Sequence, residues 1–289
     1  MIVGTRGSNL AIAQTNDICN LLSKITDEKI YKTIIKTKGD KITDSQLYNM
    51  DSKGLFTKEL DKVVLEEEVD FAVHSLKDVP TDLDEDLKIT AIPLREPANE
   101  VLISNKKWDE LKKGDSLGSS SLRREAFCKH YDKEFELKPI RGNIETRINK
   151  VLNGDVDATI MAQAGLNRLH LEKHIQMVFP IDYIYPAAGQ GAIAVISRKD
   201  SDKNNIIEKI NHNESYQTAT AEKTVLKEIG VGCQWPLGVT CQIKNNKLEL
   251  KSILLDKNGE VLYKNEKTGS INDATKLGIE IGQEMLEFL

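Results

Sequence analysis

Short apolar runs alternate along this chain with polar turns and with longer stretches in which apolar residues recur at helical spacing. One run, 71–73, predicts a buried strand. The polar residues that follow it are His74, Ser75, Lys77 and Asp78, and a proline then ends the segment. Ligands bind at the carboxyl ends of strands in open α/β sheets, so Lys77 and Asp78 mark a candidate site. The alternative is an ordinary surface turn with a solvated ion pair.

The first part of the chain predicts a sheet with helices around it. Strands are expected at 1–3, 31–38, 70–73 and 87–93, helices at 9–24 and 54–67, and a polar loop at 40–53. The turn GTRGS places Arg6 and Ser8 beside the free N–H groups of a helix start, which suits an anion. Plain capping of the helix by Ser8 is the alternative.

The second part repeats this strand, loop and helix plan. A strand expected at 101–104 is followed by Leu117-Gly118 and a serine run, and strands expected at 135–140 and 157–161 lead into two more anion-type loops. Further strands are expected at 178–181 and 193–196. A helix at 214–229, strands at 240–243, 247–255 and 261–265, and a helix at 272–288 predict a small domain. The predicted fold is α/β, with two βαβ domains and a C-terminal α+β domain that has a three-stranded antiparallel sheet. Its expected domains are 1–96 with 192–211, then 97–191, then 212–289.

Charge and composition narrow the class of function. The net charge is −5 without a basic block, which argues against a nucleic-acid partner. No stretch approaches the ~18 apolar residues of a membrane span, and no leader is evident, so we expect a cytoplasmic protein, a monomer, without a membrane partner. The cysteines, Cys19, Cys128, Cys233 and Cys241, lack metal-ligand spacing. His170 and His174 are best explained as a solvated helix end, so no metal is expected.

Arginine usage carries more information than net charge. The chain has 40 basic residues, of which only eight are arginines. Six of the eight lie in or beside segments rich in Gly, Ser or Asn: Arg6, Arg123, Arg124, Arg141, Arg147 and Arg168. Because a guanidinium grips carboxylate or phosphate in bidentate fashion, this usage indicates a ligand with several acid groups. Surface arginines that fall there by chance are the alternative.

Cys233 lies in the glycine-rich turn GVGCQWP, which would hold a thiol at the tip of a loop. A nucleophilic cysteine normally needs a His partner, and none of the five histidines lies in a motif of that kind. Cys233 could instead be a covalent anchor.

Eight ordered motifs resemble one family. They are GTRGS, SKGLFTKEL, DFAVHSLKDVPT, GSSSLRRE, RGNIETRINK, AQAGLNRL, AAGQGA and GCQWPLG, and together they are similar to the porphobilinogen deaminases, also called hydroxymethylbilane synthases. The resemblance implies two domains like periplasmic binding proteins and a third domain. It also implies a transferase of tetrapyrrole biosynthesis that joins four porphobilinogen molecules head to tail, releases ammonia and hydrolyses the product to hydroxymethylbilane.

The resemblance implies a dipyrromethane cofactor, held by a thioether to Cys233, and a catalytic Asp78. The residues that it implies for the cofactor are Cys233, Lys77, Asp78, Ser121, Arg123 and Arg124. Those that it implies for the substrate are Arg6, Ser8, Lys53, Ser119, Ser120, Arg141, Arg147 and Arg168. Val231 and Trp235 in the cysteine loop, and Ser119 in place of the usual Thr, depart from the family pattern.

The physical interpretation agrees with the resemblance. A carboxylate at Asp78 could stabilise the positive pyrrole nitrogen that forms when ammonia leaves, and could transfer protons. The competing hypothesis is a non-catalytic two-domain binding protein for a small polycarboxylate. Such a protein would use the same arginines but would have no use for Cys233.

Overall fold

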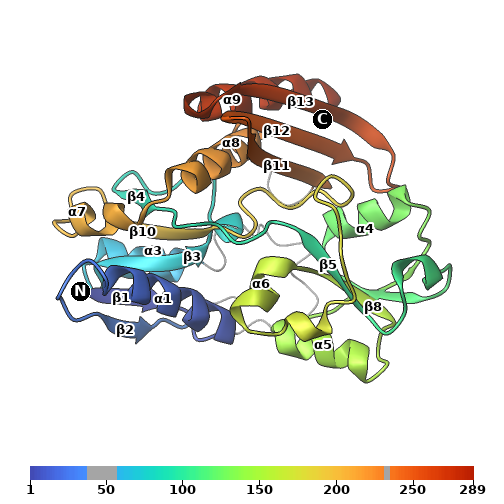
Figure 1. The fold of residues 1–289 in the computed structure, drawn as a ribbon, viewed down its shortest axis with the longest axis horizontal. Coiled ribbons are helices and arrows are strands. Elements are labelled where there is room, and N and C mark those ends of the chain that lie inside the picture. The colour runs from blue at the N-terminus through green and yellow to red at the C-terminus, as the bar shows by residue number, and fades with distance from the viewer. Residues whose placement is uncertain (38–56, 231–234) are drawn as a thin grey trace. The chain divides into compact units, whose positions relative to one another are not determined.

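The computed structural model describes residues 1–37, 57–230 and 235–289. The predictions for Lys53, Val231, Cys233 and the loop 40–53 lie outside these ranges. The chain forms two compact units, Met1–Glu96 with Gly191–Gln217, and Pro97–Gln190 with Thr218–Leu289. Both units are α/β, as the sequence predicts (Figure 1).

A five-stranded sheet forms the centre of the first unit. Its strands, in spatial order, are β2 (Tyr31–Ile34), β1 (Ile2–Thr5), β3 (Phe71–Ser75), β10 (Ile193–Arg198) and β4 (Leu87–Ala91). The first three are parallel, and β10 runs antiparallel to β3 and β4. The strand predicted at 193–196 therefore does return to the first sheet.

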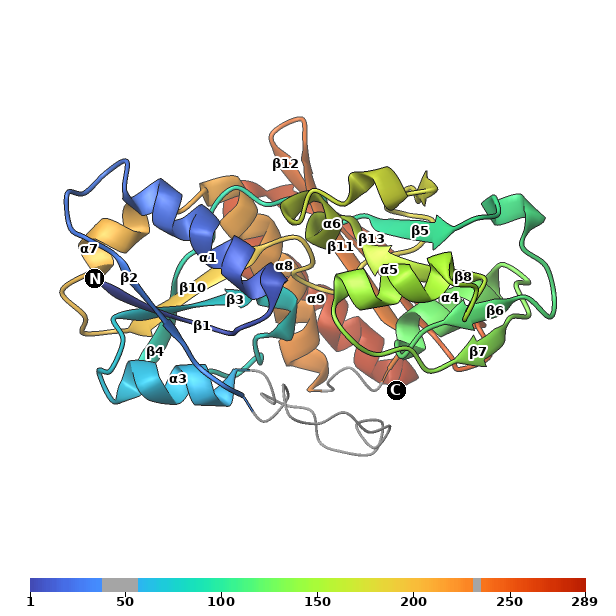
Figure 2. The same cartoon turned by 90° about the horizontal axis from the view of Figure 1, so that it is seen from below.

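Helices α1 (Asn9–Leu22) and α3 (Lys58–Leu65) lie on opposite sides of this sheet (Figure 2). Fully buried Ile18 and Leu22 of α1 share one core cluster with Phe71 and Val73 of β3. The side chains of a strand alternate between its two faces, so His74 points to the other face, where its Nε2 lies 3.4 Å from Asp61 of α3.

The second unit begins with a sheet built on the same plan. Its strands, in spatial order, are β7 (Glu136–Lys138), β6 (Ser116–Gly118), β8 (Ala158–Ala162), β5 (Glu100–Ser104) and β9 (Met177–Val178). Strands β7, β6 and β8 are parallel, and β5 is antiparallel to β8 and β9. The second sheet thus repeats three parallel strands followed by a reversed one.

Helices cover both faces of this second sheet. Val101 and Ile103 of β5 share a buried cluster with Ile148 of α5 (Ile144–Leu152). Leu102, between them, shares another cluster with Phe127 of α4 (Leu122–His130). The short helix α6 (Gln163–Arg168) directly follows β8.

The third sheet, β11 (Leu237–Lys244), β12 (Lys247–Leu255) and β13 (Val261–Ser270), is antiparallel, as predicted. Asn245 and Asn246 form its first turn with φ of 51° and 58°, values that asparagine tolerates in tight hairpins. Helices α8 (Asn213–Ile229) and α9 (Ala274–Met285) pack on one face (Figure 1).

The other face of the third sheet packs on α4 within the second unit. Ile253 and Leu255 share a buried cluster with Phe127 and Tyr185. At Gly238 the backbone comes so close to Tyr185 that an added Cβ would lie 2.3 Å from the Tyr185 Cβ. The start of β11 is therefore fixed against the segment around Tyr185.

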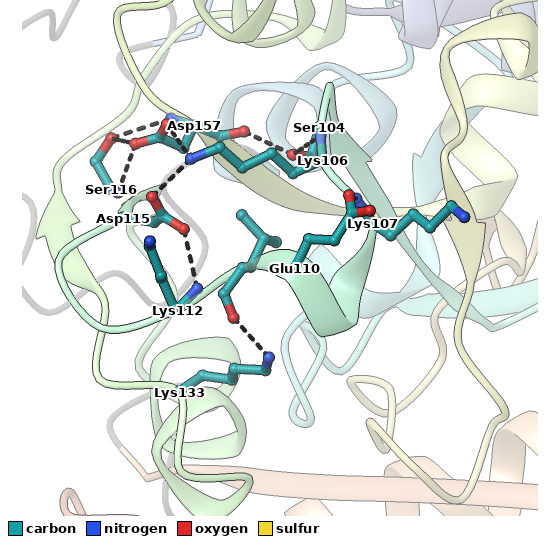
Figure 3. Close-up of polar contacts among 10 residues, drawn as sticks. Ser104, Lys106, Lys107, Glu110, Lys112, Asp115, Ser116, Lys133 and Asp157 are labelled. Carbon is teal, nitrogen blue, oxygen red and sulfur yellow. Dashed lines mark hydrogen bonds and ion pairs between the residues drawn. The ribbon is translucent and has the colours of Figure 1, made fainter.

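A polar network ties the amino-terminal edge of the second sheet together (Figure 3). Lys106 Nζ lies 2.7 Å from Asp115 and 3.2 Å from Asp157, and Ser116 donates to Asp157 through both its backbone N–H and its hydroxyl. These hydrogen bonds from Ser116 and the ion pair with Lys106 lower the pKa of Asp157 to about 2. Strands β6 and β8 are parallel, so this network lies at the opposite edge from their carboxyl ends.

Within the described ranges most of the predicted strands and helices are confirmed, with differences at their ends. Strand β12 has the predicted bounds, whereas β13 extends five residues beyond the predicted 261–265. The strand expected at 178–181 is wrong: β9 spans only Met177–Val178. Among the helices of the described ranges, none is long and apolar enough to cross a membrane.

We predict that Gly238→Ala lowers the stability of the protein by about 1–3 kcal/mol, because the methyl group overpacks the contact with Tyr185. A suitable control is Gly7→Ala, whose added methyl would meet only Ile34, at 3.4 Å. The measurement is the Tm of each variant by calorimetry. Equal Tm values for the two variants would contradict the close approach.

Candidate active site

Asp78 lies in a 3₁₀ turn, Leu76–Asp78, that directly follows β3. Leu76 is 0% exposed and Val79 is 2% exposed, whereas Asp78 between them is exposed. The backbone N–H of Leu76 also donates to Ala192 O at 3.0 Å. Two buried neighbours therefore hold an exposed carboxylate at the carboxyl end of a central strand.

The turn with Arg6 and Ser8 lies at the same edge of the first sheet. Strands β1 and β3 pair in parallel, so their carboxyl ends coincide. Gln14 of α1 donates to the Ser75 hydroxyl at 2.8 Å, which ties the helix to the end of β3. The hydroxyl of Ser8 accepts from the backbone N–H of Ala11 at 3.3 Å, so Ser8 caps α1.

His74 is not part of the polar turn in which the sequence analysis placed it. Strand β3 continues to Ser75, and His74 is 5% exposed. The predicted strand ended too early because a histidine was counted as polar, while in the fold it faces the carboxylate of Asp61.

The serine run that follows β6 is held by its own hydrogen bonds. The Ser121 hydroxyl caps α4 by accepting from the Arg124 N–H at 3.5 Å, and the Ser119 hydroxyl accepts from the Ser121 N–H at 3.0 Å. The Ser120 hydroxyl donates to Ile140 O at 3.1 Å. The three hydroxyls thus shape the loop before any ligand binds.

The two consecutive arginines of α4 share one buried carboxylate, Glu100, the first residue of β5. Arg123 donates to Glu100 Oε1 at 2.5 Å, and Arg124 donates to Glu100 Oε2 at 2.8 Å. Arg123 also donates to Tyr185 O at 2.5 Å and is only 8% exposed. The guanidinium of Arg123 therefore makes hydrogen bonds to buried groups of the protein.

Arg141 and Arg147 lie electrostatically close to Arg124. Burial, together with the positive charges of Arg124 and Arg141, lowers the pKa of Arg147 to about 10. Arg147 Nε donates to Gly142 O at 3.0 Å, and Asn143 caps the helix that carries Arg147. The structure thus brings three of the predicted arginines together as a group of like charges.

The remaining predicted residues are Arg168, Lys77, Lys53 and Cys233. Arg168 is the last residue of α6, at the end of that helix farther from β8. Lys77 is half-buried beside Asp78. Lys53 and Cys233 are not described.

Sequence reasoning missed Glu100 and Tyr185. Glu100 is 0% exposed although it is charged, and nothing in its local sequence distinguishes it from a solvated residue before an apolar strand. Its only signal lies in its partners on α4, which are 23 and 24 residues away in the chain.

The chemistry available is that of polycarboxylate binding and carboxylate catalysis. The Nε atom of Arg124 is buried and has no hydrogen-bond partner within the described residues, and the Arg124 side chain as a whole is 12% exposed. In the described part of the chain, no group of three or more His, Cys, Asp or Glu could hold a metal ion.

Two family models match the chain and leave little of it uncovered. The porphobilinogen deaminase dipyromethane cofactor binding domain matches residues 1–206. The porphobilinogen deaminase C-terminal domain matches residues 216–287.

Curated relatives match along the whole length. A protein from Methanothermobacter thermautotrophicus, named probable porphobilinogen deaminase, is 56% identical over 289 residues and covers 100% of both chains. Porphobilinogen deaminases from Desulforamulus reducens and Carboxydothermus hydrogenoformans are 40% and 42% identical, and the matches cover 98% and 99% of this chain and 93% of each relative.

Among solved structures, the methionine-binding protein MetQ matches with a TM-score of 0.47 and 8% identity, over 75% of this chain and 90% of that chain. The assignment does not depend on this likeness. The two family models and the relatives, together with the ordered motifs, show that the chain belongs to the porphobilinogen deaminase family.

Proposed function

We propose that this chain is a hydroxymethylbilane synthase in which Asp78 is the catalytic carboxylate and Cys233 anchors the dipyrromethane cofactor. Its family function is the condensation of porphobilinogen, and its cofactor-binding domain is that of the family. The cytoplasmic location and the monomeric state stay predictions. The observation that supports the proposal is the placement of Arg147, whose pKa is lowered to about 10 by burial and by the nearby charges of Arg124 and Arg141, an arrangement that suits an anionic ligand.

The arginine group fits the chemistry of the cofactor. A dipyrromethane built from two porphobilinogen units carries two acetates and two propionates, and guanidinium groups are the strongest partners for carboxylates in proteins. The buried Nε of Arg124 and the capped start of α4 supply donors for such groups. When bound, the dipyrromethane supplies a pyrrole carbon to which the first substrate can be joined.

We propose the following division of residues. Those proposed to hold the cofactor are Cys233, Lys77, Asp78, Ser121 and Arg124, supported from inside the fold by Arg123. Those proposed to bind porphobilinogen are Arg6, Ser8, Lys53, Ser119, Ser120, Arg141, Arg147 and Arg168. Residues 212–289 are proposed as the domain that carries the cysteine loop.

Asp78 has the chemistry that the reaction needs. Loss of ammonia from porphobilinogen leaves an azafulvene with positive charge on the pyrrole nitrogen. A carboxylate fixed near that nitrogen stabilises the cation, and it can accept the proton that the attacking pyrrole carbon loses after the new carbon–carbon bond forms. Because Leu76 and Val79 are buried on either side, Asp78 is held in place without losing its exposure.

We predict that the intact mass of the denatured protein exceeds the mass of the bare chain by two linked porphobilinogen-derived units. Cys233→Ser is expected to lack this excess. The protein with its cofactor is also expected to release ammonia from porphobilinogen. A bare mass after expression in cells that make porphobilinogen, without ammonia release, would instead favour the polycarboxylate-binding protein.

We predict that Asp78→Asn folds and carries the cofactor but turns over at least about a hundredfold more slowly, since the amide keeps the shape and loses the charge. Asp82→Asn, which changes another exposed carboxylate four residues later, serves as the control. The measurements are the intact mass and kcat with porphobilinogen. Turnover of Asp78→Asn close to that of the control would remove Asp78 from the catalytic role.

We predict that Arg147→Gln stabilises the protein without cofactor by about 1 kcal/mol. Burial, together with the charges of Arg124 and Arg141, lowers the pKa of Arg147 to about 10 in the folded state. Its charge therefore destabilises the fold at every pH below that value, and removing the charge relieves both the cost of burial and the repulsion. The measurement is the Tm in the Cys233→Ser background, with Lys150→Gln on the same helix as control. In the protein with its cofactor, carboxylates offset the repulsion, so the gain should shrink while KM rises. An equal gain in both forms would contradict an anion at this group.

A further inference from the structure

Glu100 is a buried carboxylate that divides its two oxygens between two arginines. Oε1 accepts from Arg123 and Oε2 accepts from Arg124, and the residue is 0% exposed. Burial opposes ionisation, but the two guanidinium groups outweigh it and lower the pKa of Glu100 to about 2. Glu100 is therefore negatively charged at every pH at which the protein would work.

The two partners of Glu100 have different surroundings. Arg123 continues inward to Tyr185 O, and the Tyr185 ring stacks on Phe127 with centroids 6.2 Å apart. Arg124 is tied to Glu100 through one nitrogen, and its buried Nε has no hydrogen-bond partner within the described ranges. Arg124 also contributes to the lowered pKa of Arg147, so it belongs to the group of like charges.

The contacts of Arg123 extend through Tyr185 to the start of the third sheet. The backbone N–H of Val239 donates to Pro186 O at 3.0 Å, beside the carbonyl that accepts from Arg123. Gly238 contacts Tyr185 closely enough to exclude a Cβ. Arg123 and Glu100 thus connect the base of β11 to Arg124 through an unbroken series of contacts.

We propose that Glu100 is a positioning residue. It holds Arg123 in the orientation that links β5 to Tyr185, and it holds Arg124 in the orientation that binds a carboxylate of the ligand. This proposal rests on the proposed function for the identity of the ligand. The proposal gives the two arginines different roles. Arg123 uses its guanidinium for hydrogen bonds within the protein, and Arg124 binds the ligand.

A purely structural ion pair is the competing explanation, and the network of Lys106 and Asp157 provides its matched control. Asp157 also has a strongly lowered pKa. It directly precedes β8, whereas Glu100 pairs with Ala162 at the carboxyl end of β8, so the two carboxylates lie at opposite edges of the sheet. Figure 3 shows the network around Asp157. Asp157→Asn should therefore reduce stability without changing any property of the arginine group.

The first test uses citrate as the probe, on full-length Cys233→Ser protein, so that neither turnover nor cofactor enters the readout. The citrate concentration dependence of Tm gives an apparent Kd. Glu100→Gln is expected to raise this Kd about tenfold, the value of one charged hydrogen bond. Glu100→Asp, which keeps the charge, should restore most of the affinity, and Asp157→Asn should leave it unchanged.

The second test is a double-mutant cycle in the protein expressed in cells that make porphobilinogen, with the fraction of chains that carry the cofactor measured by intact mass. If Glu100 acts through Arg124, Glu100→Gln lowers this fraction in the wild-type background but changes it less than about twofold when Arg124→Gln is already present. Independent effects of the two changes on this fraction would show that Glu100 does not act through Arg124 and would overturn the proposal.

If Glu100→Gln does not fold, the proposal is tested by comparing Arg123→Lys with Arg124→Lys. The proposal expects the larger fall in Tm from Arg123→Lys and the larger rise in the citrate Kd from Arg124→Lys, and the reverse order overturns it. These measurements also test the positioning role of Glu100 separately from the proposed function. A citrate Kd that depends on Glu100 in a protein without ammonia release would refute the proposed function and keep the positioning role.

Discussion

Gathering guanidinium groups at one place is the constraint on which the second unit depends. Burial, and after it the positive charges of Arg124 and Arg141, lower the pKa of Arg147. Glu100 offsets part of this repulsion from inside the fold, and it can do so only because both of its oxygens are bonded. A fully neutralised group would be more stable but would have no charge left for a polycarboxylate ligand.

The parallel strands decide where this charge lies. The loops after β6 and β7 carry the serine run and Arg141, and the opposite edge carries the network of Lys106, Asp115 and Asp157. At that edge each charge has an opposite partner, as a structural site requires. One sheet therefore has an edge where a lysine pairs with carboxylates and an edge where guanidinium groups gather, and the second coincides with the carboxyl ends of its parallel strands, where α/β proteins bind ligands.

The sequence was sufficient for most of the strands and turns, because these follow from local pattern, and the use of Arg in a Lys-rich chain singled out the arginines that are proposed to bind ligands. The sequence could not show that Arg123 and Arg124 have different roles. Consecutive residues on a helix point about 100° apart, so adjacent arginines rarely serve one ligand equally, but which of them turns inward depends on the distant Glu100. His74 was misplaced for a similar reason, since its partner Asp61 belongs to another helix.

Two carboxylates illustrate how burial assigns roles to one functional group. Glu100 is fully buried and bonded to two cations, so its charge is permanent and it cannot exchange protons near neutral pH. Asp78 stands exposed at the end of β3, held only by the buried side chains on either side of it. A group that must meet a transient cation and then take its proton needs the second environment, and one that must orient a neighbour needs the first. The burial of each carboxylate thus supports the role proposed for it more directly than its residue type does.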